Sequence, residues 1–151
     1  MVLEQKLKIK FWNKDCLVFS KKGSQMIYDV KKPILGFENV LKVEFSEIDP
    51  LFATLQAVDK DVPSFTLINP YQLREYSFDI PKDVQVLLDI NKNSNVLVYN
   101  IVVLHNPMTE SVINFKAPII LNKDNGKLAQ FIIEDEVLLT IGELLNKKNA
   151  A

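Results

Sequence analysis

The chain has 151 residues, of which 48% are hydrophobic and 25% charged, as is ordinary for a globular protein. This length suits one domain over residues 1–151. With 18 Lys+Arg against 19 Asp+Glu the net charge is −1, so no basic excess indicates a nucleic-acid surface. The single cysteine, Cys16, excludes an internal disulfide. No apolar run is long enough to span a bilayer, and the first ten residues do not form a signal peptide, so we expect a cytoplasmic protein that does not enter a membrane.

Short alternating segments dominate the first half of the chain. Leu7, Ile9 and Phe11 alternate with three lysines, which predicts a strand with one wet face. The lysine row is either a solvated strand face or a stripe that binds phosphate. A short apolar run follows at 17–19, with a turn at 20–24. Further strands are predicted at residues 26–30, 41–46, 51–58, 64–69 and 76–80.

The middle of the chain holds one helix and one long apolar strand. Ile80, Val84, Leu87 and Leu88 recur at helical spacing after Pro81. Residues 96–104 are almost continuously apolar, which is typical of a strand covered on both faces. Earlier, Gly36 is expected to supply a turn conformation that is costly for other residues.

The segment 111–122 predicts a strand interrupted by a proline. Its alternation places Ile113 and Phe115 on one face, with Asn114 and Lys116 on the other. Pro118 cannot donate to a sheet ladder, so it requires an edge or a bulge. If the alternation continues, Ile119 and Leu121 point inward, whereas Pro118 and Ile120 point outward. Such an outward apolar pair favours a protein-docking surface.

The last third of the chain completes the expected fold. Asn125-Gly126 predicts a hairpin turn, followed by a strand over 128–133. The tail reads either as a helix with Val137, Ile141, Leu144 and Leu145 on one face or as a last strand. The fold class is therefore mainly β: a small antiparallel β-barrel or sandwich with one short helix and a possible C-terminal helix.

No residue pattern supports catalysis, a cofactor or a metal. The four glycines are too far apart for a phosphate loop. His105 follows an apolar strand, and no nucleophile is positioned beside it. The acidic run 134–136 is more typical of a charged turn than of a calcium loop. Elimination leaves a non-enzymatic binding module.

Four stretches of the chain form an ordered set: 34–38 (Ile-Leu-Gly-Phe-Glu), 52–56 (Phe-Ala-Thr-Leu-Gln), 65–70 (Phe-Thr-Leu-Ile-Asn-Pro) and 112–122 (Val-Ile-Asn-Phe-Lys-Ala-Pro-Ile-Ile-Leu-Asn). In order and spacing they resemble the flagellar assembly factor FliW family of bacteria. The resemblance covers residues 34–133, and its last stretch is the most specific. It implies a β-barrel-like protein that binds flagellin and the translational regulator CsrA, so that free flagellin displaces CsrA and restores repression of flagellin mRNA.

The strand pattern and the resemblance together give eight candidate partner-binding residues. They are Asn114, Lys116, Pro118, Ile120 and Asn122 in the last stretch, with Phe52, Gln56 and Asn69 from the earlier ones. A place in the core explains Phe52 equally well, and capping of a strand end explains Asn69 and Asn122. The alternative function is direct RNA binding by a β-barrel through Lys6, Lys8 and Lys10.

Overall fold

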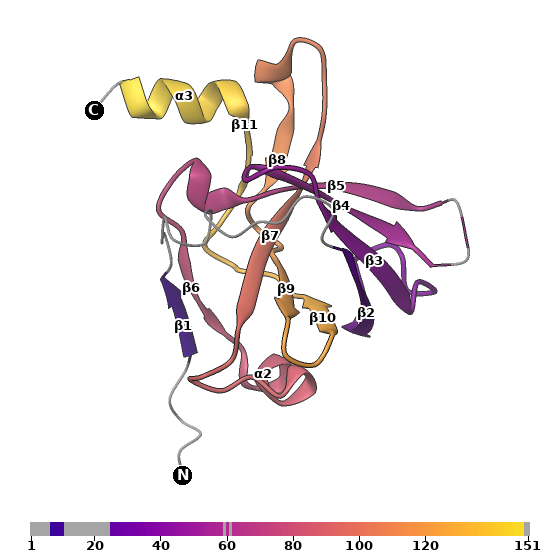
Figure 1. The fold of residues 1–151 in the computed structure, drawn as a ribbon. Coiled ribbons are helices and arrows are strands. Elements are labelled where there is room, and N and C mark those ends of the chain that lie inside the picture. The colour runs from indigo at the N-terminus through magenta and orange to yellow at the C-terminus, as the bar shows by residue number, and fades with distance from the viewer. Residues whose placement is uncertain (1–6, 11–24, 59, 61, 150–151) are drawn as a thin grey trace.

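Seven strands close into a barrel within the part of the chain that the structure describes (Figure 1). The structure is a computed structural model that describes residues 7–10, 25–58, 60 and 62–149. The apolar run at 17–19, the turn at 20–24, Lys6 and Phe11 lie outside these residues. The barrel order is β2–β3–β4–β5–β7–β9–β10, and β10 pairs back with β2.

The elements follow one another along the chain with short connections. The strands are β1 (Leu7–Lys10), β2 (Gln25–Lys32), β3 (Lys42–Glu47), β4 (Phe52–Ala57), β5 (Ser64–Ile68), β6 (Ser77–Ile80), β7 (Val96–Val103), β8 (Val112–Asn114), β9 (Ile119–Asn122), β10 (Lys127–Gln130) and β11 (Leu138–Thr140). The helical elements are η2 (Pro70–Gln72), α2 (Lys82–Leu88), η3 (Met108–Glu110) and α3 (Ile141–Asn149). The mainly β prediction is confirmed.

One pair in the barrel is parallel, although an antiparallel fold was expected. The pair is β10 with β2, whereas the other barrel pairs are antiparallel. Strand number explains the difference, because directions alternate around a closed antiparallel barrel only when the number of strands is even. With seven strands, one neighbouring pair has to run in the same direction.

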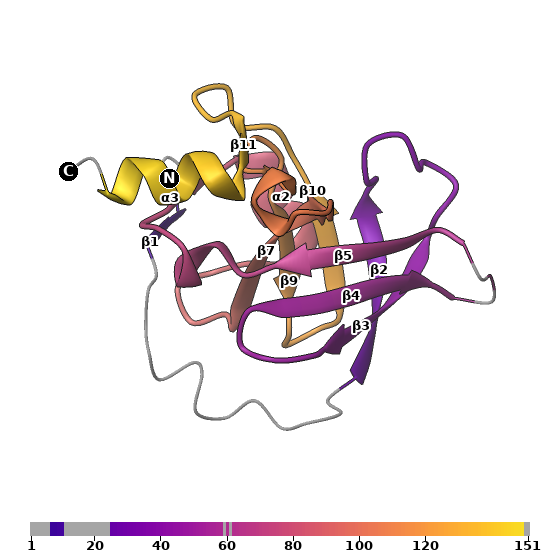
Figure 2. The same ribbon diagram turned by 90° about the horizontal axis from the view of Figure 1, so that it is seen from above.

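Two hydrophobic cores lie on opposite sides of one barrel wall. The inner core fills the barrel and includes Val43, Leu55, Leu67, Ile119 and Leu121. The outer core lies between the wall and the layer formed by β6 and α2, whose place beside the barrel is shown in Figure 1. Figure 2 shows the same arrangement from above. Its members include Tyr76, Phe78, Val84, Leu88, Phe115, Ile120 and Phe131. Both faces of β9 are therefore covered by apolar side chains.

This second core overturns the expected exposure of Pro118 and Ile120. Both residues are buried, and Ile120 has no exposed surface. The alternation itself is correct, because Ile119 and Leu121 enter the inner core while Ile120 points the other way. The face of Ile120 is covered by β6 and α2, which come from a distant part of the sequence. The segment is also two strands rather than one, β8 and β9, with residues 115–118 between them.

Several local predictions are confirmed. Tyr76, Phe78 and Ile80 point into the outer core, as their alternation predicts. Gly36 has φ +87, and Gly126 has φ +70 in the turn between β9 and β10. The two readings of the tail are both correct in part, because β11 leads directly into α3. Helix α2 begins one residue later than expected, with Pro81 as its N-cap.

Substitution of Ile120 tests the two-core arrangement. We expect Ile120→Asp and Ile119→Asp both to unfold the protein, because each places an unpaired carboxylate in an apolar core at a cost of several kcal/mol. Ile120→Ala should lower the free energy of unfolding by about 2–5 kcal/mol in a urea titration. Ile132→Ala, at a position 47% exposed, is the matched control and should cost much less. A stable Ile120→Asp variant would contradict the second core.

Candidate protein-docking surface

A bulge lies between β8 and β9, which pair one after the other with the same edge of β7. In this register Ile113 lies opposite Val102, and Ile119 lies opposite Tyr99. Between these two pairs, the bulge has five residues, 114–118, whereas β7 has only two, 100 and 101. The proline interruption seen in the sequence is this bulge, in which Pro118 does not have to donate to the ladder.

Buried polar side chains hold the first part of the bulge in place. Asn100 on β7 is fully buried, and its Nδ2 donates to the carbonyl oxygen of Asn114 at 2.8 Å and to the hydroxyl of Tyr76 at 3.1 Å. The Tyr76 hydroxyl donates in turn to the carbonyl oxygen of Phe115. Burial raises the pKa of Tyr76, so this hydroxyl keeps its proton well above neutral pH.

Two further side chains satisfy the backbone of residues 116 and 117. The Asn114 Oδ1 accepts from the backbone N–H groups of Lys116 at 3.1 Å and Ala117 at 3.2 Å. Gln130 on β10 donates from Nε2 to the carbonyl oxygen of Ala117 at 3.0 Å and accepts from Leu35 N–H at 2.7 Å. Because backbone groups buried without partners cost about 1–3 kcal/mol each, these bonds fix the shape of the bulge.

A partly buried ion pair ties the connector between β10 and β11 to this bulge. Arg74 and Glu136 form two contacts, Nη2 to Oε2 at 2.7 Å and Nη1 to Oε1 at 3.3 Å. The Arg74 guanidinium carbon lies 4.5 Å from the centre of the Phe115 ring. Lys116 Nζ donates to the carbonyl oxygens of Glu134 and Glu136. The connector is thus held at a defined distance from the barrel.

The start of α3 is fixed by short-range bonds. Thr140 and Glu143 form a capping box, in which Thr140 N–H donates to Glu143 Oε1 at 2.8 Å and Glu143 N–H donates to Thr140 Oγ1 at 3.0 Å. Ile141 N–H donates to the carbonyl oxygen of Ser111 at 3.0 Å. Helix α3 therefore projects from the body of the molecule as a positioned arm (Figure 1).

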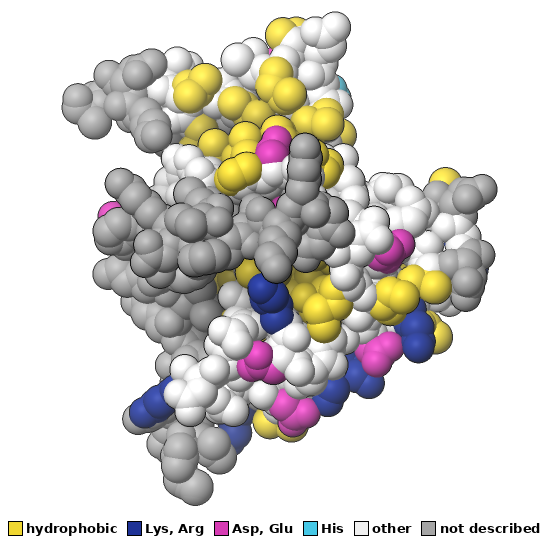
Figure 3. Space-filling model, viewed as in Figure 1, with side chains coloured by type: hydrophobic (Ala, Val, Ile, Leu, Met, Phe, Trp, Pro, Cys, Tyr) yellow, Lys and Arg dark blue, Asp and Glu magenta, His cyan; other side chains and the backbone are white. Residues whose placement is uncertain are grey.

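Beyond the barrel, the end of β7 forms a small sheet with β8 and β11. Val102, Ile113 and Leu139 are in register and point to one face, where all three are buried. Their neighbours Val103, Val112 and Leu138 point to the other face, where Val103 is 55% and Leu138 is 53% exposed. We call this surface, with Asn114, the docking face. Hydrophobic side chains gather on this part of the molecule, over the end of β7, β8, β11 and α3 (Figure 3).

A hollow of about 590 Å³ lies on the opposite side of this sheet, under α3. It is lined by Leu73, Arg74, Asp135, Glu136, Val137, Leu139 and Leu144. The Arg74–Glu136 pair forms its polar side, and Leu139 and Leu144 form its apolar side. Val137 also lines the hollow and is 51% exposed, so apolar surface is accessible on both sides of the β8–β11 sheet.

The eight predicted residues do not form one surface. Pro118 and Ile120 are buried, so the structure contradicts their expected exposure, and Asn122 is buried as well. Asn122 donates from Nδ2 to the carbonyl oxygen of Leu88 at 2.8 Å, which ties β9 to the end of α2. Only Asn114 and Lys116 lie at the docking face or beside it, both half-buried.

The three residues predicted from earlier strands lie apart from the docking face. Asn69 is the N-cap of η2 and accepts from Tyr71 N–H at 3.0 Å, which supports the capping explanation. Phe52 packs against the outer core while remaining half-buried. Gln56, at the far end of β4, donates to the carbonyl oxygen of Lys60 at 2.9 Å. Sequence patterns missed Val103 and Leu138, because only the β7–β8–β11 register places them on the same face of one sheet, with β8 between them.

The described residues offer little for catalysis or metal binding. No group of three or more His, Cys, Asp or Glu side chains among them is arranged to hold a metal ion. His105 is exposed at the end of β7, where its backbone N–H donates to Ser111 Oγ at 2.9 Å. None of the helices within the described ranges is both long enough and apolar enough to cross a membrane.

Removal of the Tyr76 hydroxyl tests the hydrogen bonds that hold the bulge. Tyr76→Phe should lower the free energy of unfolding by about 1–3 kcal/mol, because it leaves the buried Phe115 carbonyl without its donor. Tyr28→Phe is the matched control, since Tyr28 is equally buried and its substitution leaves the Phe115 carbonyl with its donor. A urea titration compares the two variants. Equal losses would show that the hydroxyl bond does not stabilise the bulge.

The Arg74–Glu136 pair should contribute more than an exposed pair. Glu136→Ala leaves a partly buried guanidinium without its partner and should cost about 1–3 kcal/mol. Asp83→Ala, which removes the exposed Lys32–Asp83 pair, should cost less than about 1 kcal/mol. Thermal unfolding measures both. If Asp83→Ala lowered the stability as much as Glu136→Ala, the Arg74–Glu136 pair would not be stronger than an exposed pair.

Comparisons with known proteins identify the family. The model of the FliW protein family matches residues 19–141. The chain is 48% identical over 109 residues to flagellar assembly factor FliW 2 of Wolinella succinogenes, covering 72% of this chain and 80% of that protein. It is 42% identical over 121 residues to flagellar assembly factor FliW of Sulfurimonas denitrificans, covering 80% and 96%.

A solved structure has the same fold. The crystal structure of the flagellar assembly factor FliW matches with a TM-score of 0.70 and 24% identity, covering 78% of this chain and 84% of that chain. The resemblance read from the four sequence stretches is confirmed by the family model and the relatives. The chain belongs to the FliW family and is a non-enzymatic flagellar assembly factor.

Proposed function

We propose that this flagellar assembly factor binds flagellin and the regulator CsrA in the cytoplasm, and so couples flagellin synthesis to flagellum assembly. Membership of the family supports an assembly role. The exposed apolar docking face supports a protein partner, because groups of large apolar side chains on a surface mark interaction sites. Flagellin that has not been assembled displaces CsrA, and the released CsrA represses flagellin mRNA.

The docking face carries the flagellin contact in this proposal. Val103, Val112 and Leu138 form its apolar centre, and Asn114 and Lys116 lie at its edge. Burial of apolar surface stabilises a complex by about 25 cal/mol per Å², so half-exposed valine and leucine side chains are suitable anchors. The face is held by strand pairing and by the bulge, so a partner pays little to order it.

Two aspartate substitutions on the docking face test the flagellin contact. Val103→Asp and Leu138→Asp should each weaken flagellin binding at least tenfold in isothermal titration calorimetry, while the thermal unfolding midpoint stays close to that of the parent chain. The expected weakening follows from placing a carboxylate in an apolar contact. Val62→Asp is the matched control, because Val62 is 72% exposed on a loop at a different part of the barrel.

Three outcomes would count against the proposal. In calorimetry, Val62→Asp would weaken flagellin binding as much as the two docking-face variants do. In size-exclusion chromatography at micromolar concentration, neither flagellin nor CsrA from the same organism would co-elute with the chain, or a chain saturated with flagellin would still retain CsrA. Binding of flagellin leader RNA by the chain alone, lost when Lys6, Lys8 and Lys10 become glutamate, would favour the RNA-binding alternative.

A further inference from the structure

Strand β6 is paired along one edge with the N-terminal strand β1. Phe78 and Ile80 are buried in the outer core, whereas Ser77 and Asp79 are exposed. Among the described strands, β6 pairs only with β1, and the two form a separate sheet outside the nine-stranded one (Figure 1). The strand that pairs with this edge of β6 is thus β1, which has only four residues.

Strand β1 lies outside the part of the chain that the FliW family model matches. The match begins at residue 19, so it includes β6 but not residues 7–10. Within the matched residues, no described strand pairs with β6. An edge strand with unpaired N–H and C=O groups is a template for pairing with another extended segment. Here the chain's own N-terminal part supplies that segment.

The register shows which residue types suit this edge. Leu7 lies opposite Ile80, Ile9 lies opposite Phe78, and Lys8 lies opposite Asp79. In β1, apolar residues alternate with lysines. They lie opposite the apolar residues of β6 and opposite its acidic or polar residues, respectively. Opposite charges on directly paired residues stabilise a sheet, and like charges destabilise it.

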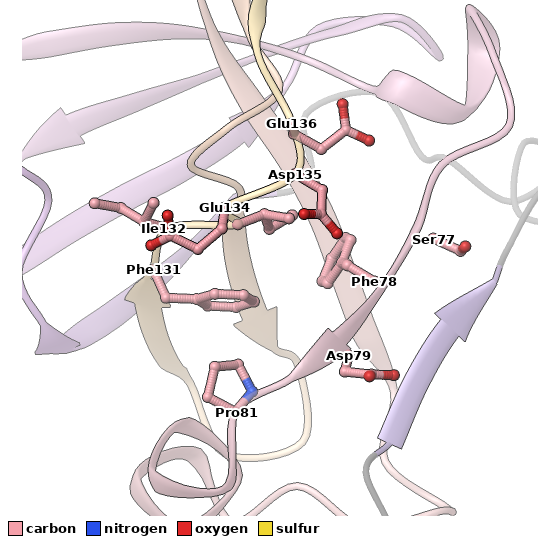
Figure 4. Close-up of a pocket in the computed structure, with 10 residues that line it drawn as sticks. Ser77, Phe78, Asp79, Pro81, Phe131, Ile132, Glu134, Asp135 and Glu136 are labelled. Carbon is pink, nitrogen blue, oxygen red and sulfur yellow. The ribbon is translucent and has the colours of Figure 1, made fainter.

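Further carboxylates surround a hollow beside β6. The hollow has a volume of about 390 Å³, and Phe78, Pro81 and Phe131 line its apolar side (Figure 4). Its polar side carries Asp79, Glu134, Asp135 and Glu136, and among the residues that the structure describes no lysine or arginine is part of its lining. Glu136 is paired with Arg74, whereas Glu134 and Asp135 are exposed and form no ion pair with a described residue. A basic segment would be attracted to this edge.

We propose that β6 is a strand-addition site for an extended partner segment in which lysine or arginine alternates with apolar residues, and that β1 is its intramolecular occupant. The partner segment replaces β1 by forming the same antiparallel ladder with Ser77–Ile80. This interaction goes beyond flagellin and CsrA binding at the docking face, because it uses a different strand and regulates access by release of β1. A partner with acidic residues in place of the basic ones is excluded by the carboxylates.

A labelled peptide with the sequence of residues 5–11 tests the proposal on the full-length protein. The peptide should bind the parent chain weakly, because β1 competes at an effectively intramolecular concentration. Ile9→Pro removes a backbone donor from β1 and should tighten peptide binding at least tenfold. Lys8→Glu, which places like charges opposite each other, should tighten it less. Fluorescence anisotropy gives the affinities, and circular dichroism verifies the fold of each variant.

Charge reversal provides the matched control. A peptide with its three lysines replaced by glutamate should not bind the Ile9→Pro variant, and Asp79→Lys in that variant should weaken the lysine peptide at least tenfold. Hydrogen exchange at residues 77–80 should rise in Ile9→Pro and return to the parent level when the lysine peptide is added. Equal affinity for parent and folded variants, or unchanged exchange at residues 77–80, would overturn the proposal.

Discussion

The buried hydrogen bonds of Asn100 and Tyr76 determine how the two halves of this fold are joined. They satisfy the backbone at Asn114 and Phe115, where the chain leaves β8 and begins the bulge that leads to β9. Because β8 and β9 share one edge of β7, the bulge allows a single long strand to take part in both the barrel and the sheet beyond it. Without these bonds, the carbonyl groups of the bulge would be buried without donors, and the register of β8 would lose its support.

The position of the C-terminal arm depends on the same bulge. Phe115 lies under the Arg74 guanidinium, which pairs with Glu136, and Lys116 contacts the backbone of the connector. These contacts set where β11 begins, and β11 completes the docking face before α3 starts. A flagellar assembly factor without catalytic chemistry needs a surface of defined shape, and here a polar cluster inside the protein supplies that definition.

Sequence periodicity predicted the strands and their inward residues well, because those depend on neighbouring positions. Tyr76, Phe78 and Ile80 are examples, as is the interruption at Pro118. Periodicity could not predict that Ile120 is buried, since the cover on its face comes from β6 and α2. It also could not predict the docking face, because Val103 and Leu138 share one face only through the pairing of β7 and β11 with β8. The family could be recognised from short stretches because they coincide with elements that build the barrel, as 112–122 does for β8, the bulge and β9.

The most direct test of the docking face is hydrogen–deuterium exchange of the full-length chain with and without flagellin. We expect slower exchange in the complex at residues 101–104, 112–114 and 137–140, with little change at residues 82–88 of α2, which lies near the opposite end of β7 (Figure 1). Protection confined to residues outside the first three segments, in a complex shown to be saturated, would contradict the proposed surface. The exchange pattern reads the location of the partner without any substitution that alters the fold.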